Sequence, residues 1–206
     1  MKSAALSRLS LGVVSALSVV SIDAAQADLR LFVAGGLNTL TPEADAGETA
    51  PKYSGGEGKV AGHFDVFSPV PGLSLYAGPE FRLVALTSEE TNQGVVSKLN
   101  LDSNFGGLEA GVNFGMIPMV TLQAGYNYSS LLSGEVKAQS PLTSVSVKAS
   151  SGSESGITLR GLITPFPLTR LGVEYSLGNG SAKYDGDETA SKYSFWAARA
   201  VVGIAL

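Results

Sequence analysis

The chain contains no cysteine and only one histidine among its 206 residues. The absence of cysteine excludes disulfide bonds, thiolate metal sites, cysteine nucleophiles and lipid attachment through a cysteine. A single histidine excludes a zinc site built from several imidazoles. Charged residues account for 16% of the chain, below the roughly 25% of ordinary soluble domains. The formal net charge is −4 without any basic block, so we expect no nucleic-acid partner. We also expect no bound cofactor or metal, because the acidic segment around Asp185 and Asp187 lacks the rest of a calcium-loop pattern.

The first 27 residues have the features of a secretory signal peptide. Two basic residues, Lys2 and Arg8, precede an apolar stretch over residues 9–22, and Ala25-Gln26-Ala27 matches the small-x-small cleavage pattern. The apolar stretch is interrupted by serines and is too short for a spanning helix, which needs about 20 residues. We therefore predict cleavage before Asp28.

The mature domain, residues 28–206, contains no long apolar run, which excludes a bundle of membrane-spanning helices. Apolar and polar residues alternate instead with period two, the pattern of β-strands. The alternation occurs in eight segments: 29–34, 60–66, 73–83, 108–114, 120–126, 157–163, 171–177 and 196–206. An even number of strands is typical of a single-chain outer membrane β-barrel.

The connections between these segments alternate in length. Four are long and polar (39–58, 87–104, 135–154 and 185–191), and three are short and contain proline (68–72, 115–119 and 164–169). Outer membrane barrels have short periplasmic turns and longer extracellular loops. The pattern predicts an all-β fold, an eight-stranded antiparallel up-and-down transmembrane β-barrel. One residue, Pro79, interrupts a predicted strand, and we expect a bulge or bend there.

The charged residues of the predicted strands all fall on the less apolar phase of the alternation. They are Arg30, Asp65, Glu80, Arg82, Glu109, Arg160, Glu174 and Arg199, and His63 shares their phase. The other phase carries mainly leucine, valine, isoleucine and aromatic residues. Four arginines turned towards lipid would cost roughly 8–16 kcal/mol, at about 2–4 kcal/mol each. We therefore expect the charged phase to face the lumen and to close it as a paired network.

The aromatic residues form two groups that suit the two membrane interfaces. Beside the short turns lie Phe67, Phe114 and Phe166, and towards the long connections lie Tyr126, Tyr128, Tyr175, Tyr184, Tyr193 and Trp196.

The signal peptide, the eight strands, the proline turns and the inward Arg/Glu set together resemble the outer-membrane-protein-A-type superfamily of small barrels, which includes outer membrane protein X and adhesion-related relatives. The resemblance covers 28–206, and it leaves no room for a peptidoglycan-binding domain. Such barrels usually end in an aromatic residue, whereas this chain ends in Leu206.

The resemblance implies a location in the outer membrane, contact with its lipid and lipopolysaccharide, and biogenesis by periplasmic chaperones and the barrel-assembly machinery. We expect a monomer without enzymatic activity, with a structural, adhesion or surface-interaction role and an extracellular ligand bound by the four long loops. One alternative is a narrow channel or a carrier of small apolar molecules. Another is a lipid A-modifying enzyme centred on His63, although no serine partner stands out.

Overall fold

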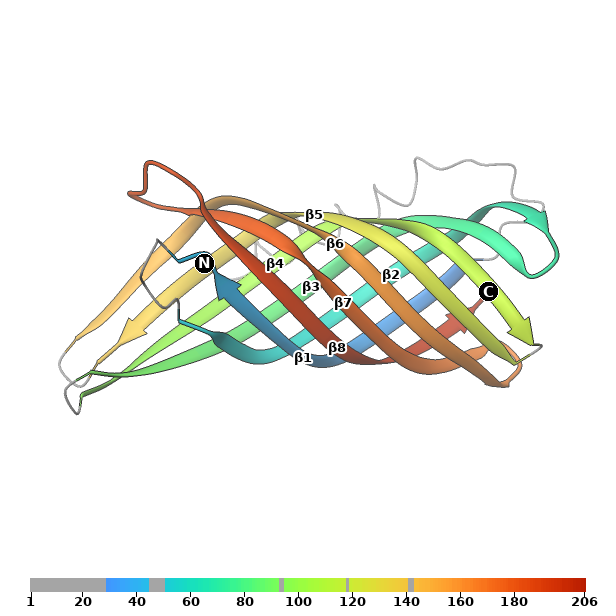
Figure 1. Ribbon diagram of the computed structural model, residues 1–206, viewed down its shortest axis with the longest axis horizontal. Coiled ribbons are helices and arrows are strands. Elements are labelled where there is room, and N and C mark those ends of the chain that lie inside the picture. Colours follow the sequence, from blue (N-terminus) through green and yellow to red (C-terminus); the bar gives the residue numbers. More distant parts are fainter. Residues whose placement is uncertain (1–28, 45–50, 93–94, 118, 141–142) are drawn as a thin grey trace, which may run out of the picture.

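The computed structural model describes residues 29–44, 51–92, 95–117, 119–140 and 143–206, so the expected signal peptide lies outside the described residues. The described chain forms eight strands: β1 (Leu29–Pro42), β2 (Tyr53–Val70), β3 (Leu73–Asn92), β4 (Val95–Ile117), β5 (Val120–Gln139), β6 (Ser144–Phe166), β7 (Thr169–Tyr184) and β8 (Ser191–Ala205). Each strand pairs antiparallel with the next, and β1 pairs with β8 to close the barrel (Figure 1). Within the described ranges, no helix has the length and apolar character needed to cross a membrane. The predicted eight-stranded antiparallel barrel is confirmed.

One end of the barrel, called here the turn end, carries the three short connections. β2 and β3 are separated only by Pro71 and Gly72, and Gly72 has a φ of +83° that a glycine adopts without steric cost. The described chain also begins and ends there, because the Leu206 N–H donates a 2.8 Å hydrogen bond to the Leu29 carbonyl. The predicted proline-bearing turns are therefore present, although each is shorter than expected.

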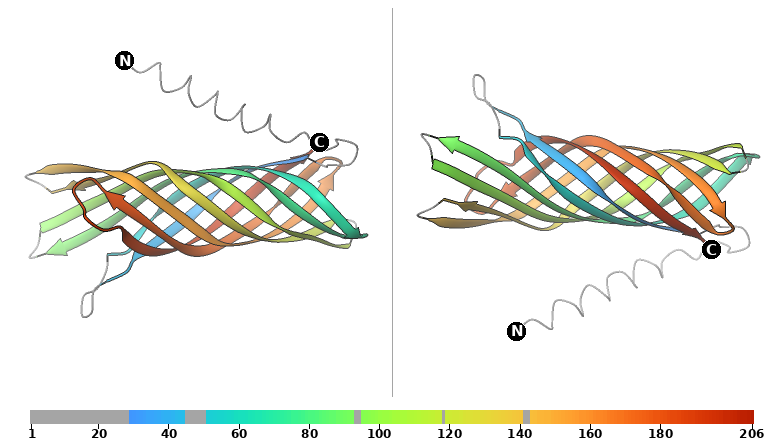
Figure 2. Two further views of the ribbon diagram at one scale, coloured as in Figure 1. Left: turned by 90° about the horizontal axis from the view of Figure 1, so that it is seen from above. Right: turned by 90° about the horizontal axis from the view of Figure 1, so that it is seen from below.

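The opposite end, called here the hairpin end, differs from the prediction. The expected loop 87–104 is almost entirely strand, because β3 continues to Asn92 and β4 begins at Val95. The expected loop 135–154 is reduced in the same way to residues 140–143, and the expected loop 39–58 is reduced to 43–52. Only the connection expected at 185–191 is close to its prediction, since it spans residues 185–190. Two of the four expected loops, 87–104 and 135–154, are thus mainly extended β-hairpins, and β3–β6 reach furthest (Figures 1 and 2).

The two phases of the alternation face the sides that were predicted. On the inward side, Arg82 and Glu109 are buried, whereas the neighbouring outward residues Leu83 and Leu108 are 51% and 66% exposed. Outward apolar residues recur on every strand, which gives the barrel an apolar belt of the kind that contacts hydrocarbon. Among the aromatic residues, Tyr184 and Tyr193 contradict the prediction, because both line the interior at the hairpin end.

The polarity of the two phases is inverted at the hairpin end. On β3, the inward residues change from Glu80 and Arg82 to Val84 and Leu86, while the outward residues become polar, as at Thr87. The same inversion occurs on β4 and β8, where Leu101, Phe105, Tyr193 and Phe195 are buried. This part of the barrel is built like a water-soluble one, with apolar side chains inside, so it suits an aqueous environment rather than lipid.

Pro79 fits into the barrel without a shift in register. The β2–β3 pairs on either side of it, Ala61↔Glu80 and Phe64↔Ala77, belong to one continuous register, so the expected bulge at Pro79 is wrong. The neighbouring Gly78 allows β2 and β3 to approach closely, since a Cβ at this position would lie 1.6 Å from the Gly62 carbonyl oxygen. The bulges of this strand pair lie instead near the turn end, after Asp65.

Candidate functional site: a filled lumen beneath an apolar cup

The middle of the lumen is filled by an ion-pair network centred on Lys59. The Lys59 ammonium lies 2.7 Å from Glu109, 2.9 Å from Glu80 and 3.4 Å from Glu174, and each of these side chains is at most 2% exposed. Arg160 pairs with both Glu109 and Glu174. The charges are therefore compensated, as buried charges require, both between neighbouring strands and across the lumen between strands that are not neighbours.

The network continues towards the hairpin end through two further arginines. Arg199 lies 2.5 Å from Glu174 and 2.6 Å from Glu57, and Arg82 connects Glu57 with Glu154. Tyr193 donates a 2.8 Å hydrogen bond to Glu154, and this is the last contact of the network towards the hairpin end.

A chain of amides extends the network towards the turn end. Arg160 donates a 2.5 Å hydrogen bond to Gln123, Gln123 donates to Asn113 at 2.6 Å, and Asn113 donates to Asp65 at 2.8 Å. Asp65 in turn pairs with Arg30. One connected set of polar side chains thus runs through the lumen from Arg30 to Tyr193.

The structure places all nine residues that the sequence singled out within the lumen. Eight of them are buried, and Asp65 is partly buried at the turn end with a side chain that is 16% exposed. His63 takes little part in the hydrogen bonding, because both ring nitrogens lack a hydrogen-bond partner and Nε2 lies 3.8 Å from Glu109. Its ring stacks on Tyr76 at a centroid distance of 4.5 Å. His63 therefore packs as a core residue.

Sequence reasoning missed three charged members of the network: Glu57, Lys59 and Glu154. Glu57 and Glu154 lie in segments that were assigned to loops, because the surrounding residues are mostly glycine and serine. Their positions in the period-two alternation could have identified them as residues that face the lumen. Glu57 and Lys59 share the phase of His63 and Asp65, and Glu154 shares the phase of Arg160.

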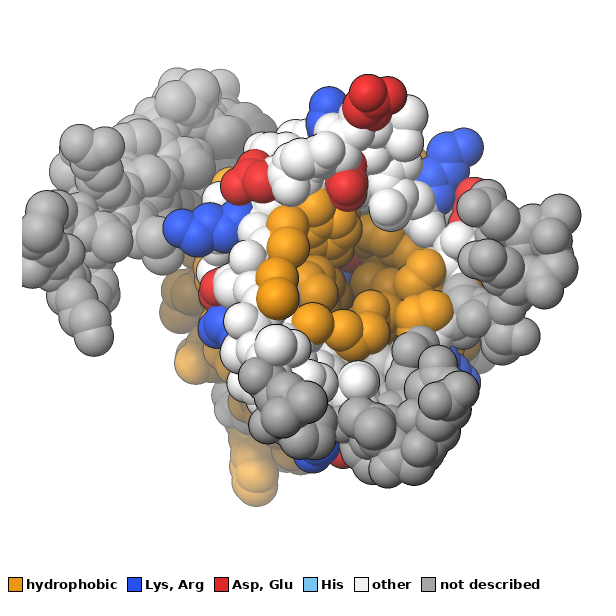
Figure 3. All heavy atoms as spheres, turned by 90° about the vertical axis from the view of Figure 1, so that its left-hand side faces the viewer, with side chains coloured by type: hydrophobic (Ala, Val, Ile, Leu, Met, Phe, Trp, Pro, Cys, Tyr) orange, Lys and Arg blue, Asp and Glu red, His pale blue; other side chains and the backbone are white. Residues whose placement is uncertain are grey.

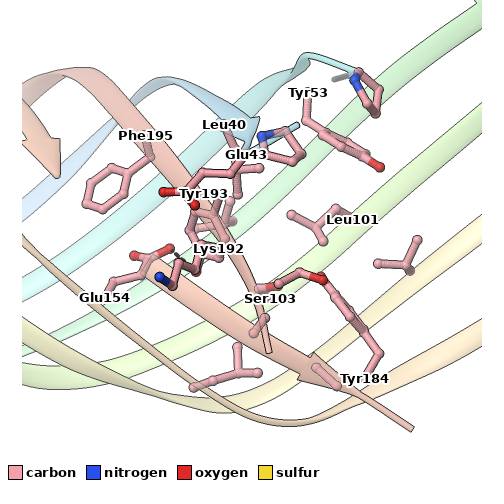
Figure 4. Close-up of a pocket in the computed structure, with 18 of the residues that line it drawn as sticks. Leu40, Glu43, Tyr53, Leu101, Ser103, Glu154, Tyr184, Lys192, Tyr193 and Phe195 are labelled. Atoms are coloured by element: carbon pink, nitrogen blue, oxygen red, sulfur yellow. Dashed lines mark hydrogen bonds between the residues drawn. The ribbon is translucent and has the colours of Figure 1, made fainter. Parts of the chain in front are cut away.

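Above the network, the hairpin end encloses a cavity of about 520 Å³, called here the apolar cup. Seen from this end, hydrophobic side chains surround a hollow, and charged side chains gather on the rim (Figure 3). The apolar walls come from all eight strands and include Leu40, Tyr53, Val84, Leu101, Phe105, Leu131, Val136, Val147, Ala182, Tyr184, Tyr193 and Phe195. Figure 4 shows several of these side chains, with Glu154 beside Tyr193.

The cup also contains a few polar groups at its base. Asn38 donates a 2.6 Å hydrogen bond from Nδ2 to Glu57, and its Oδ1 is buried without a partner. Glu154 and Ser103 also line the cavity. The cup is thus an apolar container whose base is the upper surface of the ion-pair network.

No protein-family model matches the chain, and no curated protein matches it in sequence. Among solved structures, it is similar to the Neisserial surface protein A (NspA), with 11% identity, a TM-score of 0.50, and coverage of 87% of this chain and 98% of that one. It is also similar to Ail, the attachment invasion locus protein of Yersinia pestis (15% identity, TM-score 0.42, coverage 85% and 98%), and to the outer membrane protease OmpT from Escherichia coli (10%, 0.43, 87% and 96%). The likeness to NspA supports the fold. The chain has the fold of an eight-stranded transmembrane β-barrel, as its sequence predicted.

Proposed function

We propose that this protein is a monomeric outer membrane barrel that does not conduct, and whose protruding β-hairpins act in surface interaction or adhesion. It reaches the membrane after removal of residues 1–27, with the help of periplasmic chaperones and the barrel-assembly machinery. In the membrane, its apolar belt contacts lipid and lipopolysaccharide. The hairpins take the place of the long loops that the sequence suggested.

The observation that carries this proposal is a four-stranded sheet that extends beyond the rest of the barrel. A membrane-crossing strand needs about 9–11 residues, whereas β4 and β6 have 23 residues each. Pairing between β6 and β7 ends at Ala149↔Tyr184, and pairing between β2 and β3 ends at Ser54↔Thr87. Beyond these pairs, β3–β6 continue further than β2 and β7, and among the described residues no strand pairs with the two outer edges of this sheet.

An edge strand offers its backbone groups to an added strand from another polypeptide. The Lys148 carbonyl accepts a 2.9 Å hydrogen bond from the Asp185 N–H, so the β6 edge comprises residues 144–147. Its sequence, Ser-Val-Ser-Val, alternates in the way that strand pairing favours. The partner class that suits this surface is therefore an extended segment of a protein on another cell or in the surrounding matrix.

The proposal includes no enzymatic role. His63, the residue that a lipid A-modifying enzyme would use, is fully buried in the lumen, where its ring stacks on Tyr76 and contacts the tilted ring of Phe32. A catalytic histidine needs access to its substrate and a hydrogen bond to the group that it activates. Mass spectra of lipid A from cells with and without the protein are expected to be identical.

The adhesion of cells that display the protein tests the proposed role. Ser146→Pro removes a backbone donor from the free β6 edge and is expected to reduce adhesion to immobilised matrix proteins and epithelial cells to the level of cells without the protein. The matched control is Ser146→Thr, which keeps the donor and should adhere normally. Equal adhesion of both variants and of cells lacking the protein would contradict the proposal.

Planar-bilayer recordings test the filled lumen independently. The refolded protein is expected to give no discrete conductance steps, because buried side chains occupy the lumen from Arg30 to Tyr193. Reproducible steps that change with Arg82→Ala or Glu109→Ala would support the channel alternative instead.

A further inference from the structure

The apolar cup has no role in the proposed surface interaction, yet it has the features of a binding site. We propose that it binds a small neutral amphipathic molecule from the external medium, with an apolar body and one hydrogen-bond donor directed at Asn38. This inference does not depend on the hairpins, since the cup lies inside the barrel.

The size and lining of the cup indicate the apolar body. Protein interiors are normally packed without large voids, whereas the hairpin end encloses about 520 Å³. Ligand pockets typically measure about 300–1,000 Å³ and combine apolar walls with a few polar groups. Val84, Leu101, Phe105 and Phe195 supply such walls. If the hairpin end served only as a folded core, larger side chains would be expected to fill this space.

The polar groups at the base of the cup indicate that the ligand carries a hydrogen-bond donor. Glu57 is a carboxylate partnered by two arginines, and it accepts the 2.6 Å hydrogen bond from Asn38 Nδ2. Because an ionised carboxylate only accepts hydrogen bonds, the amide oxygen of Asn38 must point away from Glu57. This oxygen is buried and has no partner, in a side chain that is only 3% exposed. A buried acceptor without a partner is the group that a ligand hydroxyl or N–H would satisfy.

The charges at the base indicate a neutral ligand. Arg82, which lies in the network beneath the cup, already pairs with Glu154, Glu57 and Glu80, so it is not available to an anion. Glu154 is likewise occupied, by Arg82 and by the Tyr193 hydroxyl. The other charged residues that line the cavity, Glu43, Asp187 and Lys192, are exposed. A charged group at the base of the cup would therefore lie among apolar side chains without a free counter-ion, which is unfavourable.

The network beneath the cup determines the side from which a ligand can enter and leave. Buried side chains fill the lumen below Asn38 and Glu154, whereas the hollow opens at the hairpin end (Figure 3). A molecule bound in the cup enters and leaves on the same side. The cup is therefore a capture site and not part of a path across the membrane.

The test uses the full mature protein in nanodiscs of a saturated phosphatidylcholine, with methyl groups labelled for NMR. The probes are 2-naphthol, which has a hydroxyl donor, and 2-methoxynaphthalene, which has a similar body without a donor. We expect 2-naphthol to cause saturable shifts of the Val84, Leu86 and Leu101 methyl signals but not of the lipid-facing Val112 and Leu159. The ether should bind about tenfold more weakly, the effect of losing one hydrogen bond to a buried acceptor.

Two variants locate the site. Ser103→Trp places a large side chain in the cup and should abolish the saturable shifts, whereas Asp102→Trp, on the outward face of the same strand, should retain them. Asn38→Leu should bind both probes with equal affinity. Heat-dependent gel mobility checks that each variant folds. If Asn38→Leu does not fold, Ser103→Trp still tests whether the probe binds in the cup. Absence of saturable shifts, or unchanged binding by Ser103→Trp, would overturn the proposal, and equal affinity of the unmodified protein for both probes would overturn the role of Asn38.

Discussion

The Lys59 ammonium donates a 2.7 Å hydrogen bond across the lumen to Glu109 Oε2, and so connects β2 with β4, which are separated in the barrel by β3. Both side chains are almost completely buried. Removing one member of a buried ion pair leaves an uncompensated charge, at a cost of about 3–5 kcal/mol. We therefore expect Lys59→Met to lower the free energy of unfolding by about this amount, measured by urea titration in lipid vesicles.

Two variants control this prediction. Lys148→Met removes an exposed lysine and should change the free energy of unfolding by less than about 0.5 kcal/mol. The double variant Lys59→Met/Glu109→Gln removes both charges, so it should be less destabilised than the sum of the two single variants. Additive effects would show that the pair is not energetically coupled.

The position of the membrane along the barrel can be tested by placing arginine on the outward face of β4. Leu108 is 66% exposed in the apolar belt, and Leu108→Arg should destabilise the folded barrel by about 2–4 kcal/mol. Asp102 lies on the same face further towards the hairpin end, where the outward residues are polar. Asp102→Arg should therefore have little effect in the same unfolding assay. A similar cost at both positions would place the hairpin end within the membrane.

The sequence predicted those parts of the barrel in which the alternation is simple. Arg160 and Glu174 were assigned to the lumen because leucine, valine and isoleucine flank them on the other phase, and the structure pairs them directly across β6 and β7. Lys59 was missed because the glycines before it have no side chain that could mark a phase. A strand made largely of glycine and serine resembles a loop in composition, and only its pairing with neighbouring strands reveals it.

The apolar cup was missed for a different physical reason. Leu40, Leu101 and Tyr193 share the inward phase with the charged residues, so the rule that charges face inward gives no indication of an apolar interior at the hairpin end. A β-bulge on β5 also changes the phase of the alternation, since Asn104 pairs with Ser133 whereas Phe105 pairs with Leu131. The inversion of polarity becomes visible only when the register of neighbouring strands is known.

Processing of the precursor provides a test that is independent of the barrel. Cleavage after Ala27 gives a mature protein that begins at Asp28, and mass spectrometry of the exported protein should report this N-terminus. Ala27→Asp places a charged residue where the cleavage pattern requires a small one, so the precursor should accumulate. Ala27→Ser keeps a small side chain and should be processed normally. A mature N-terminus elsewhere would correct the boundary without affecting the fold.

The close approach of β2 and β3 at Gly78 predicts an unusual sensitivity to the smallest side chain. A Cβ on Gly78 would lie 1.6 Å from the Gly62 carbonyl oxygen, and neither backbone can move without disturbing the strand pairing on both sides. We expect Gly78→Ala to lower the free energy of unfolding by about 1–3 kcal/mol, as overpacking does in a closely packed interior.

Gly58 is the matched control, because a Cβ there meets nothing within 4 Å. Gly58→Ala should leave stability unchanged or slightly higher, since alanine restricts the unfolded chain more than glycine does. If both variants unfold at the same urea concentration, β2 and β3 do not approach as closely as the structure shows.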